Sequence, residues 1–308
     1  MTFNKKNIIL SLAFLFLLSF FISYNISFAQ QKIVVGVYED PPMVFIDENK
    51  PKGFAVELIE YVAKSENIKI EYKHGTWSEM LKWLDSGKID LVVDILENED
   101  RSKKYFFNKE PMILSWGIII KNKYSDIENF LDLEGKKVGY LKNDYYAIEK
   151  NGLFNKLDEF NVDANLIGFD TYSQMYKKIN AGEIDVGLGN RLGKKEVYKY
   201  GNLALTNLMV APGGVKIAVK DNNNKYFLTI FDDYIRRLKQ EDGSYFNTRY
   251  NYWFGNYSTL KFKHYLMNRK EIIFLVIMSI FISFIVLRYQ VYKKSKALKK
   301  TNKQLENH

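Results

Sequence analysis

From about residue 31 to residue 255 the chain alternates between short apolar stretches and amphipathic stretches. KIVVGVY, near the start, is dense in Val and Ile without a breaker, which predicts a β-strand. FAVELIEYVAKSEN, a little later, places its apolar residues at helical spacing and predicts a helix. The order repeats through IKIEYKHG, TWSEMLKWLDSG and KIDLVVDIL, and it restarts at DLEGKKVGYL. DYYAIEKNGLFNKLDEF is expected to be helical as well. This alternation predicts an α/β fold with helices on the faces of a sheet.

One unit of this pattern occurs twice. SEMLKWLDSGKIDLVVDI, residues 78–95, and SQMYKKINAGEIDVGLGN, residues 173–190, share Ser, Met, Lys, Gly and Ile-Asp at the same spacing. Any two helix–Gly–strand units have some likeness, so chance is one interpretation. The other is two similar α/β lobes. The carboxyl ends of the strands and the helix N-termini would then face a cleft suited to a small polar ligand.

The N-terminus has the features of a secretory signal. Lys5 and Lys6 precede the apolar run 8–22, and small residues follow at Ser27 and Ala29. This arrangement predicts a signal peptide over 1–29. An uncleaved anchor helix is the alternative, and both place the following residues outside the cytoplasm.

A second apolar run lies near the C-terminus. Residues 272–287 are uncharged and contain no Pro or Gly, which predicts a transmembrane helix over 271–288. A buried core helix is the alternative. Lysines are frequent in 289–308, so the positive-inside rule places this basic, helical tail in the cytoplasm. Residues 257–270 would form a juxtamembrane linker.

Composition narrows the function further. The formal net charge is +9, but much of the positive charge lies at the two predicted membrane ends, so we do not expect nucleic-acid binding. There is no cysteine and there are three histidines, and no metal-ligand cluster or marked acid–base pair is visible. We therefore expect no enzyme activity, no metal and no cofactor.

The motifs together resemble a known family. VGVYEDPPMVFIDENKPKGFAVELIEYVA, TWSEMLKWLDSGKIDLVVDILENEDRSKKYFFNKEP, DLEGKKVGYLKNDYY, YSQMYKKINAGEIDVGLGN and GGVKIAVK occur in the order typical of solute-binding protein family 3. EPMILSWGIIIKN and GNRLGKKEVYKYG resemble the extracytoplasmic sensor domains of membrane histidine kinases and diguanylate cyclases. The resemblance implies the type II periplasmic binding fold, a two-lobed hinged clamp over 31–256. It places lobe 1 at 31–120 and 213–256, lobe 2 at 121–212, and the hinge strands near 120–124 and 211–214.

The resemblance also suggests ligand-binding residues in lobe 1. Arg101 stands where the family has an arginine that pairs with a ligand carboxylate, which a guanidinium can bind in a bidentate manner. Taken alone, the stretch ENEDRSKK equally fits a solvated surface arginine. Tyr38, Trp77 and Trp116 are candidate pocket walls or ordinary packing residues. Asp94 could receive an ammonium group or cap a strand end.

In lobe 2, the resemblance points to three more residues. Asn143 and Asp144 stand where the family often has Gly-Ser or Gly-Thr at a helix N-terminus, and they would cap that helix well. Asn190 stands where amino-acid binders commonly have an aspartate for the α-ammonium group. Because Asn carries no charge, either the amine is bound elsewhere, by Asp94 or Asp144, or the ligand is not an ordinary α-amino acid.

These observations favour a membrane-anchored extracytoplasmic sensor that closes on a small polar solute, an amino acid or a related carboxylate. A kinase or cyclase module would be its output partner, and heptad spacing in the tail would allow a dimer. A plain basic stop-transfer tail is the alternative for that segment. The first alternative function is an anchored binding component of an ABC amino-acid importer, with a permease as partner. The second is a degenerate membrane protein that no longer binds solute.

Overall fold

The computed structural model describes residues 31–255 and 270–305. The predicted signal peptide and almost all of the predicted linker lie outside these residues. The chain divides into two compact units, one up to Arg249 and one from Tyr250 onward, and each is described by itself.

The first unit is built on one large sheet. Its strand order, for the described residues, is β4-β1-β5-β11-β7-β10-β8-β9, with β6 also paired to β11. The strands are β1 Lys32–Val37, β4 Lys69–His74, β5 Leu91–Leu96, β6 Phe106–Phe107, β7 Ile113–Asn122, β8 Lys137–Leu141, β9 Asn165–Phe169, β10 Val186–Asn190 and β11 Leu203–Val219. A separate hairpin joins β2 (Phe45–Asp47) and β3 (Lys50–Lys52).

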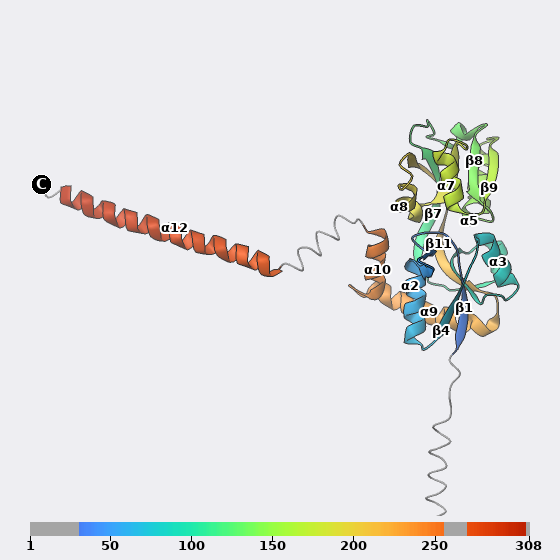
Figure 1. The fold of residues 1–308 in the computed structure, drawn as a ribbon, viewed down its shortest axis with the longest axis horizontal. Helices are drawn as coiled ribbons and strands as arrows, with labels where there is room; N and C mark the ends of the chain where they lie inside the picture. Colours follow the sequence, from blue (N-terminus) through green and yellow to red (C-terminus); the bar gives the residue numbers. More distant parts are fainter. Residues whose placement is uncertain (1–30, 256–269, 306–308) are drawn as a thin grey trace, which may run out of the picture. The chain divides into compact units, whose positions relative to one another are not determined.

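The sheet has two parallel halves. β1 pairs in parallel with β4 and β5, and β8 pairs in parallel with β9 and β10. β7 and β11 pair with each other in antiparallel orientation between the two halves (Figure 1). We call the half with β1, β4 and β5 lobe 1 and the half with β8, β9 and β10 lobe 2. The β7–β11 register shifts between Val210 and Gly213, where Ala211 has a φ of 45°. This irregularity falls in the predicted hinge 211–214; the exact lobe and hinge boundaries remain predictions.

Helices cover the faces of both lobes. α2 (Phe54–Ser65) shows why: its buried residues recur three or four positions apart, which places them on one face against the sheet. The others in this unit are α3 Trp77–Asp85, α4 Glu99–Ser102, α5 Tyr145–Ile148, α6 Leu153–Glu159, α7 Tyr172–Asn180, α8 Lys194–Val197, α9 Lys225–Gln240 and the start of α10 Tyr245–Phe254.

The helix expected through DYYAIEKNGLFNKLDEF is not continuous. It forms α5 and α6, separated by a turn in which Gly152 is the N-cap of α6. A Cβ added at Gly152 would lie 2.8 Å from the carbonyl oxygens of Tyr146 and Glu149. The chain therefore turns tightly at this position, and an amphipathic pattern that spans it does not reveal the break.

The repeated sequence unit is a repeated structural unit. Thr76 caps α3 and Thr171 caps α7, each accepting a hydrogen bond from a backbone N–H three residues later. Asp90 accepts a hydrogen bond of 2.8 Å from a backbone N–H of β1. Asp185 accepts one of 2.8 Å from a backbone N–H of β8. The two copies thus make the same local contacts, which supports the two-lobe interpretation over chance.

The second unit includes α12, a continuous helix over Lys270–Leu305. Among the residues that the structure describes, no helix is long and apolar enough to cross a membrane. The transmembrane helix predicted over 271–288 is therefore not confirmed.

Candidate functional site

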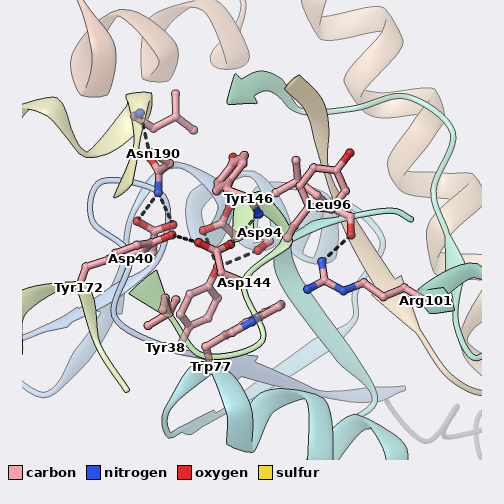
Figure 2. Close-up of a pocket in the computed structure, with 13 residues that line it drawn as sticks. Tyr38, Asp40, Trp77, Asp94, Leu96, Arg101, Asp144, Tyr146, Tyr172 and Asn190 are labelled. Carbon is pink, nitrogen blue, oxygen red and sulfur yellow. Dashed lines mark hydrogen bonds between the residues drawn. The ribbon is translucent and has the colours of Figure 1, made fainter. Parts of the chain in front are cut away.

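A small cavity lies between the two lobes, at the carboxyl ends of their strands (Figure 2). Its volume is about 20 Å³, close to the space that one water molecule needs. A larger solute can therefore enter only if the lobes separate. The cavity is lined by Tyr38, Asp40, Trp77, Asp94, Leu96, Arg101, Leu141, Asp144, Tyr145, Tyr146, Tyr172, Asn190 and Leu192.

Tyr38 and Asp94 line the lobe 1 side of the cavity. The Tyr38 hydroxyl donates to the Asp94 carbonyl oxygen at 2.8 Å and to its carboxylate at 3.0 Å. The Tyr38 ring packs at 4.9 Å from the Trp77 ring. Asp94 has a φ of 57°, an unfavourable conformation for a residue with a side chain, and it lies within β5. Strained backbone of this kind is concentrated at functional sites.

Arg101 is held rigidly at one edge of the cavity. It belongs to α4, whose N-cap Asn98 accepts from the Arg101 backbone N–H at 2.9 Å. Its guanidinium donates to the Leu96 carbonyl oxygen at 2.7 Å and to the Asn143 carbonyl oxygen at 2.9 Å. Arg101 is only 7% exposed, so the interpretation as a solvated surface arginine is wrong.

Asn143 and Asp144 bring lobe 2 to the cavity. Asp144 is the N-cap of α5 and accepts from the Tyr146 backbone N–H and, at 3.0 Å, from the Tyr172 hydroxyl. The Asn143 carbonyl accepts from Arg101 and also from the Trp77 indole at 3.0 Å. The predicted helix cap is therefore confirmed for Asp144 but not for Asn143, whose side chain donates to the Ser78 hydroxyl at 2.9 Å instead. Asn143 thus connects the two lobes directly.

Asn190 is the last residue of β10, and both the oxygen and the nitrogen of its side chain are hydrogen-bonded within the protein. Its side-chain oxygen accepts from the backbone N–H groups of Leu192 and Gly193 at 2.9 and 3.0 Å. Its amide nitrogen donates to the two carboxylate oxygens of Asp40 at 3.1 and 3.0 Å. Asn190 thus orients an acid that comes from lobe 1.

Three buried carboxyl groups and one buried guanidinium line the cavity, with the guanidinium at its edge. Burial raises the pKa of Asp94 to about 7 and that of Asp144 to about 6, despite hydrogen bonds that favour their charged forms. Burial, together with the charge of Asp94, also raises the pKa of Asp40. Removal from water lowers the pKa of Arg101. The site therefore holds acids that change their proton occupancy near neutral pH, and a ligand cation would favour their charged forms.

The structure brings most of the predicted residues together. Tyr38, Trp77, Asp94, Arg101, Asp144 and Asn190 line the cavity, and Asn143 adjoins it. Trp116 does not: its ring packs against the Arg191 guanidinium, and it lines a separate pocket near the hinge. Within the described ranges, no acidic or imidazole side chains are grouped so as to hold a metal ion.

Sequence reasoning missed Asp40 and Tyr172. Asp40 lies three residues after the end of β1, and Tyr172 is the first residue of α7. In such a fold, the carboxyl ends of strands and the starts of helices face the cleft. The positions of Asp40 and Tyr172 near these ends were therefore the only sequence features that could have indicated a place in the site. Tyrosine and aspartate are common on surfaces, however, and nothing in their own residue type distinguishes them.

Two α/β lobes joined by paired antiparallel strands, with a polar cavity at the strand ends, define the type II periplasmic binding fold. The chain belongs to the bacterial extracellular solute-binding proteins, family 3, which it matches over residues 33–256. It is accordingly a solute-binding protein and not an enzyme.

Three known proteins illustrate the relationship. The L-cystine-binding protein TcyJ of Escherichia coli K12 is 30% identical over 231 residues, which cover 71% of this chain and 80% of that protein. An ancestral arginine-binding protein bound to glutamine has a TM-score of 0.62 at 25% identity, covering 74% of this chain and 99% of its own. A histidine kinase sensor domain similar to periplasmic binding proteins has a TM-score of 0.63 at 25% identity, covering 73% and 97%.

Proposed function

We propose that the protein binds an amino acid between its lobes and presents it to an ABC importer. The observation that carries this proposal is that one interlobe cavity is lined by a buried guanidinium and by buried carboxyl groups. Arg101 would bind the α-carboxylate and the acids would bind ammonium. L-cystine and amino-acid ABC transporter-binding proteins among the relatives support both the ligand class and the partner.

Closure would follow from contacts with both lobes. Arg101 and Asp94 belong to lobe 1, and Asp144 and Asn190 belong to lobe 2. A ligand that contacts both sets stabilises the arrangement in which they are close, because only that arrangement offers all the contacts at once. A ligand held by one lobe alone would not favour closure.

A ligand screen tests the proposal. Thermal unfolding of the full-length protein is measured with the common L-amino acids and L-cystine, and a solute at a hundredfold excess over its Kd adds about 2.7 kcal/mol to stability. Arg101→Ala should abolish the shift, and Arg101→Lys should weaken it because it lacks the planar fork. Arg236→Ala, on the exposed side of α9, is the matched control. No stabilisation by any amino acid would refute the proposal and favour the degenerate, non-binding alternative.

Sensing is the second candidate, favoured by the likeness to a histidine kinase sensor domain. It requires attachment to the membrane through the C-terminal segment, whereas the described residues contain no helix long and apolar enough to cross one. Carbonate extraction of cell membranes decides whether the chain is integral to them. Co-purification of a permease would favour transport, and co-purification of a kinase or cyclase would favour sensing.

A further inference from the structure

Another pocket lies at the predicted hinge between the lobes, and we call it the hinge pocket. Its volume is about 480 Å³, which is in the range of sites that bind small organic molecules. It is lined by Trp116 of β7, by Asn151 and Lys156 from the region around the start of α6, and by residues 209–212 of β11. None of these residues lines the interlobe cavity, so the hinge pocket is a site of its own.

The hinge pocket presents large apolar side chains to solvent. Met209 is 56% exposed, and Trp116 is partly exposed although it lies in the middle of a strand. Burying such surfaces against a ligand is favourable because apolar area is removed from water, and a methionine adapts its shape to what it contacts. The wall formed by Trp116 and Met209 therefore suits a flat, apolar ligand.

Positive charge accompanies this apolar wall. Lys156 lines the pocket, and the guanidinium carbon of Arg191 lies 4.5 Å from the centre of the Trp116 ring. No acidic side chain is among the described residues that line the pocket. Lys156 pairs with Glu159 at 2.6 Å, but both side chains are partly exposed, and such a pair contributes about 1 kcal/mol or less. A ligand carboxylate can therefore compete for Lys156.

The hinge pocket and the interlobe cavity are connected by direct packing. A Cβ added at Gly117 would lie 2.7 Å from the side chain of Tyr146, which lines the cavity, and 2.7 Å from that of Val210, which lines the pocket. Ala211, with its φ of 45°, donates its backbone N–H to the Asn151 carbonyl oxygen at 2.9 Å. A ligand in the pocket would thus contact the strained hinge backbone and the packed layer that adjoins the cavity.

We propose that the hinge pocket binds an aromatic carboxylate, and that its occupancy changes the affinity of the interlobe site. Trp116 and Met209 hold the ring, and Lys156 binds the carboxylate. A ligand that fits one hinge conformation better than another shifts the equilibrium between them, and the two ligands then change each other's affinity by the same factor. The site itself is independent of the proposed function, whereas the coupling rests on it.

A pair of indole compounds that differ in charge tests the site. Binding of indole-3-acetate and of uncharged indole-3-acetamide to the full-length protein is measured by titration calorimetry at pH 7.5. We expect one indole-3-acetate to bind per chain, about five-fold or more tightly than indole-3-acetamide. Absence of saturable indole-3-acetate binding overturns the site. Equal binding of the two compounds overturns the assignment of a carboxylate as the ligand group.

Substitutions on the pocket wall locate the bound probe. Met209→Glu should weaken indole-3-acetate by about ten-fold or more, because it places a carboxylate in the apolar wall. The matched control is Leu131→Glu, at a position that is 60% exposed in the 3-10 helix η1 (Phe130–Leu133), and it should have almost no effect. Lys156→Gln should remove the preference for the charged compound. If Met209→Glu binds indole-3-acetate as tightly as the natural protein, the assignment to the hinge pocket is wrong.

The coupling is tested by repeating the indole-3-acetate titration with an amino acid from the ligand screen present at saturation. We expect the affinity for indole-3-acetate to change by about three-fold or more. An unchanged affinity overturns the coupling and leaves the site in place. Failure of every amino acid to bind overturns the proposed function and the coupling together, while the titration without amino acid still decides whether the site exists.

Discussion

The α3–β5 unit of lobe 1 and the α7–β10 unit of lobe 2 are alike except at the ends of their strands that line the cavity. Both have a threonine cap, a left-handed glycine turn and an aspartate that binds the neighbouring strand. At the cavity, however, lobe 1 presents Asp94 in a left-handed conformation, and lobe 2 presents Asn190 in an extended one. The scaffold depends on local contacts far from the cavity. The strand ends can therefore differ in charge while the unit stays the same.

The largest effect on stability is expected when Asn190 of lobe 2 is replaced by an acid, so that both lobes present a carboxyl group to the cavity. Asn190→Asp removes the donor to Asp40 and places a second carboxylate beside it in a buried site. We expect a loss of about 2–4 kcal/mol in the free energy of unfolding at pH 7.5, and less at pH 5, where carboxyl groups regain protons. Urea unfolding measures it.

The reciprocal exchange is the control. In Asn190→Asp with Asp40→Asn, one amide again faces one carboxylate, so most of the lost stability should return. If Asn190→Asp alone is as stable as the natural protein, the Asp40–Asn190 pairing does not contribute as described.

The pH dependence of stability should also distinguish the lobes. Because Asp94 and Asp144 have raised pKa values of about 7 and about 6, the folded protein keeps protons that the unfolded chain has already lost. Their contribution to stability is present at low pH and is lost as pH rises from about 4 to about 7, with a slope of up to about 1.4 kcal/mol per pH unit for each proton.

Urea unfolding between pH 4 and pH 8 tests this. Asp94→Asn should flatten the curve mainly towards pH 7, and Asp144→Asn should flatten it at lower pH. An unchanged slope in both variants would show that these carboxyl groups titrate normally.

A smaller effect concerns the two aspartates that bind the neighbouring strands. We expect Asp90→Ala to lower the free energy of unfolding by about 1–2 kcal/mol and Asp185→Ala by about 0.5–1 kcal/mol. The difference arises because a hydrogen bond contributes less to stability where water can replace it. Asp90 is half-buried and Asp185 is exposed. Asp158→Ala is the control for loss of an exposed acid, and a larger cost for Asp185→Ala than for Asp90→Ala would contradict this reasoning.

The smallest and most symmetrical effect is expected at the glycine turns. Gly87 and Gly182 have φ values of 69° and 73°, and a Cβ added to either would meet no other atom. Replacing either glycine with alanine should therefore lower the free energy of unfolding by about 1 kcal/mol, through backbone strain alone. Gly201→Ala, also in open space but without a positive φ, should have almost no effect. Clearly unequal costs at the two turns would show that the units are less equivalent than their contacts indicate.

Most of the fold could be predicted because it depends on local patterns. Alternating strands and amphipathic helices, and the repeated unit with its glycine turn, correspond to β1, α2, α3, β5, α7 and β10. The order of strands across the sheet, by contrast, could not be predicted from local patterns. β11 separates β5 from β7 through pairings between residues far apart in sequence, and no periodicity encodes them.

The site was less predictable because it depends on which side chains are buried. Arg101 has the sequence surroundings of a surface residue. Only its contacts with the Leu96 carbonyl oxygen in its own lobe and the Asn143 carbonyl oxygen across the cleft show that it is enclosed. Trp116 looked like a pocket wall, but its side chain faces Arg191. The role of Asn190 depended on Asp40, which a reading of one motif at a time could not connect to it.

The way β11 completes lobe 1 has a consequence for the order of folding. In lobe 2, one continuous stretch of chain supplies β8, β9 and β10. In lobe 1, β5 pairs with β11 only when Val215 meets Leu96, and β11 is synthesised after all of lobe 2. Because distant pairings must overcome a larger loop-closure entropy, we expect lobe 2 to gain protected backbone amides first during refolding. Pulse-labelling hydrogen exchange would record this order, with β8–β10 protected ahead of β5. Lobe 1, whose strands β1, β4 and β5 are synthesised first and which carries Asp40 and Asp94, would thus be the last to become complete.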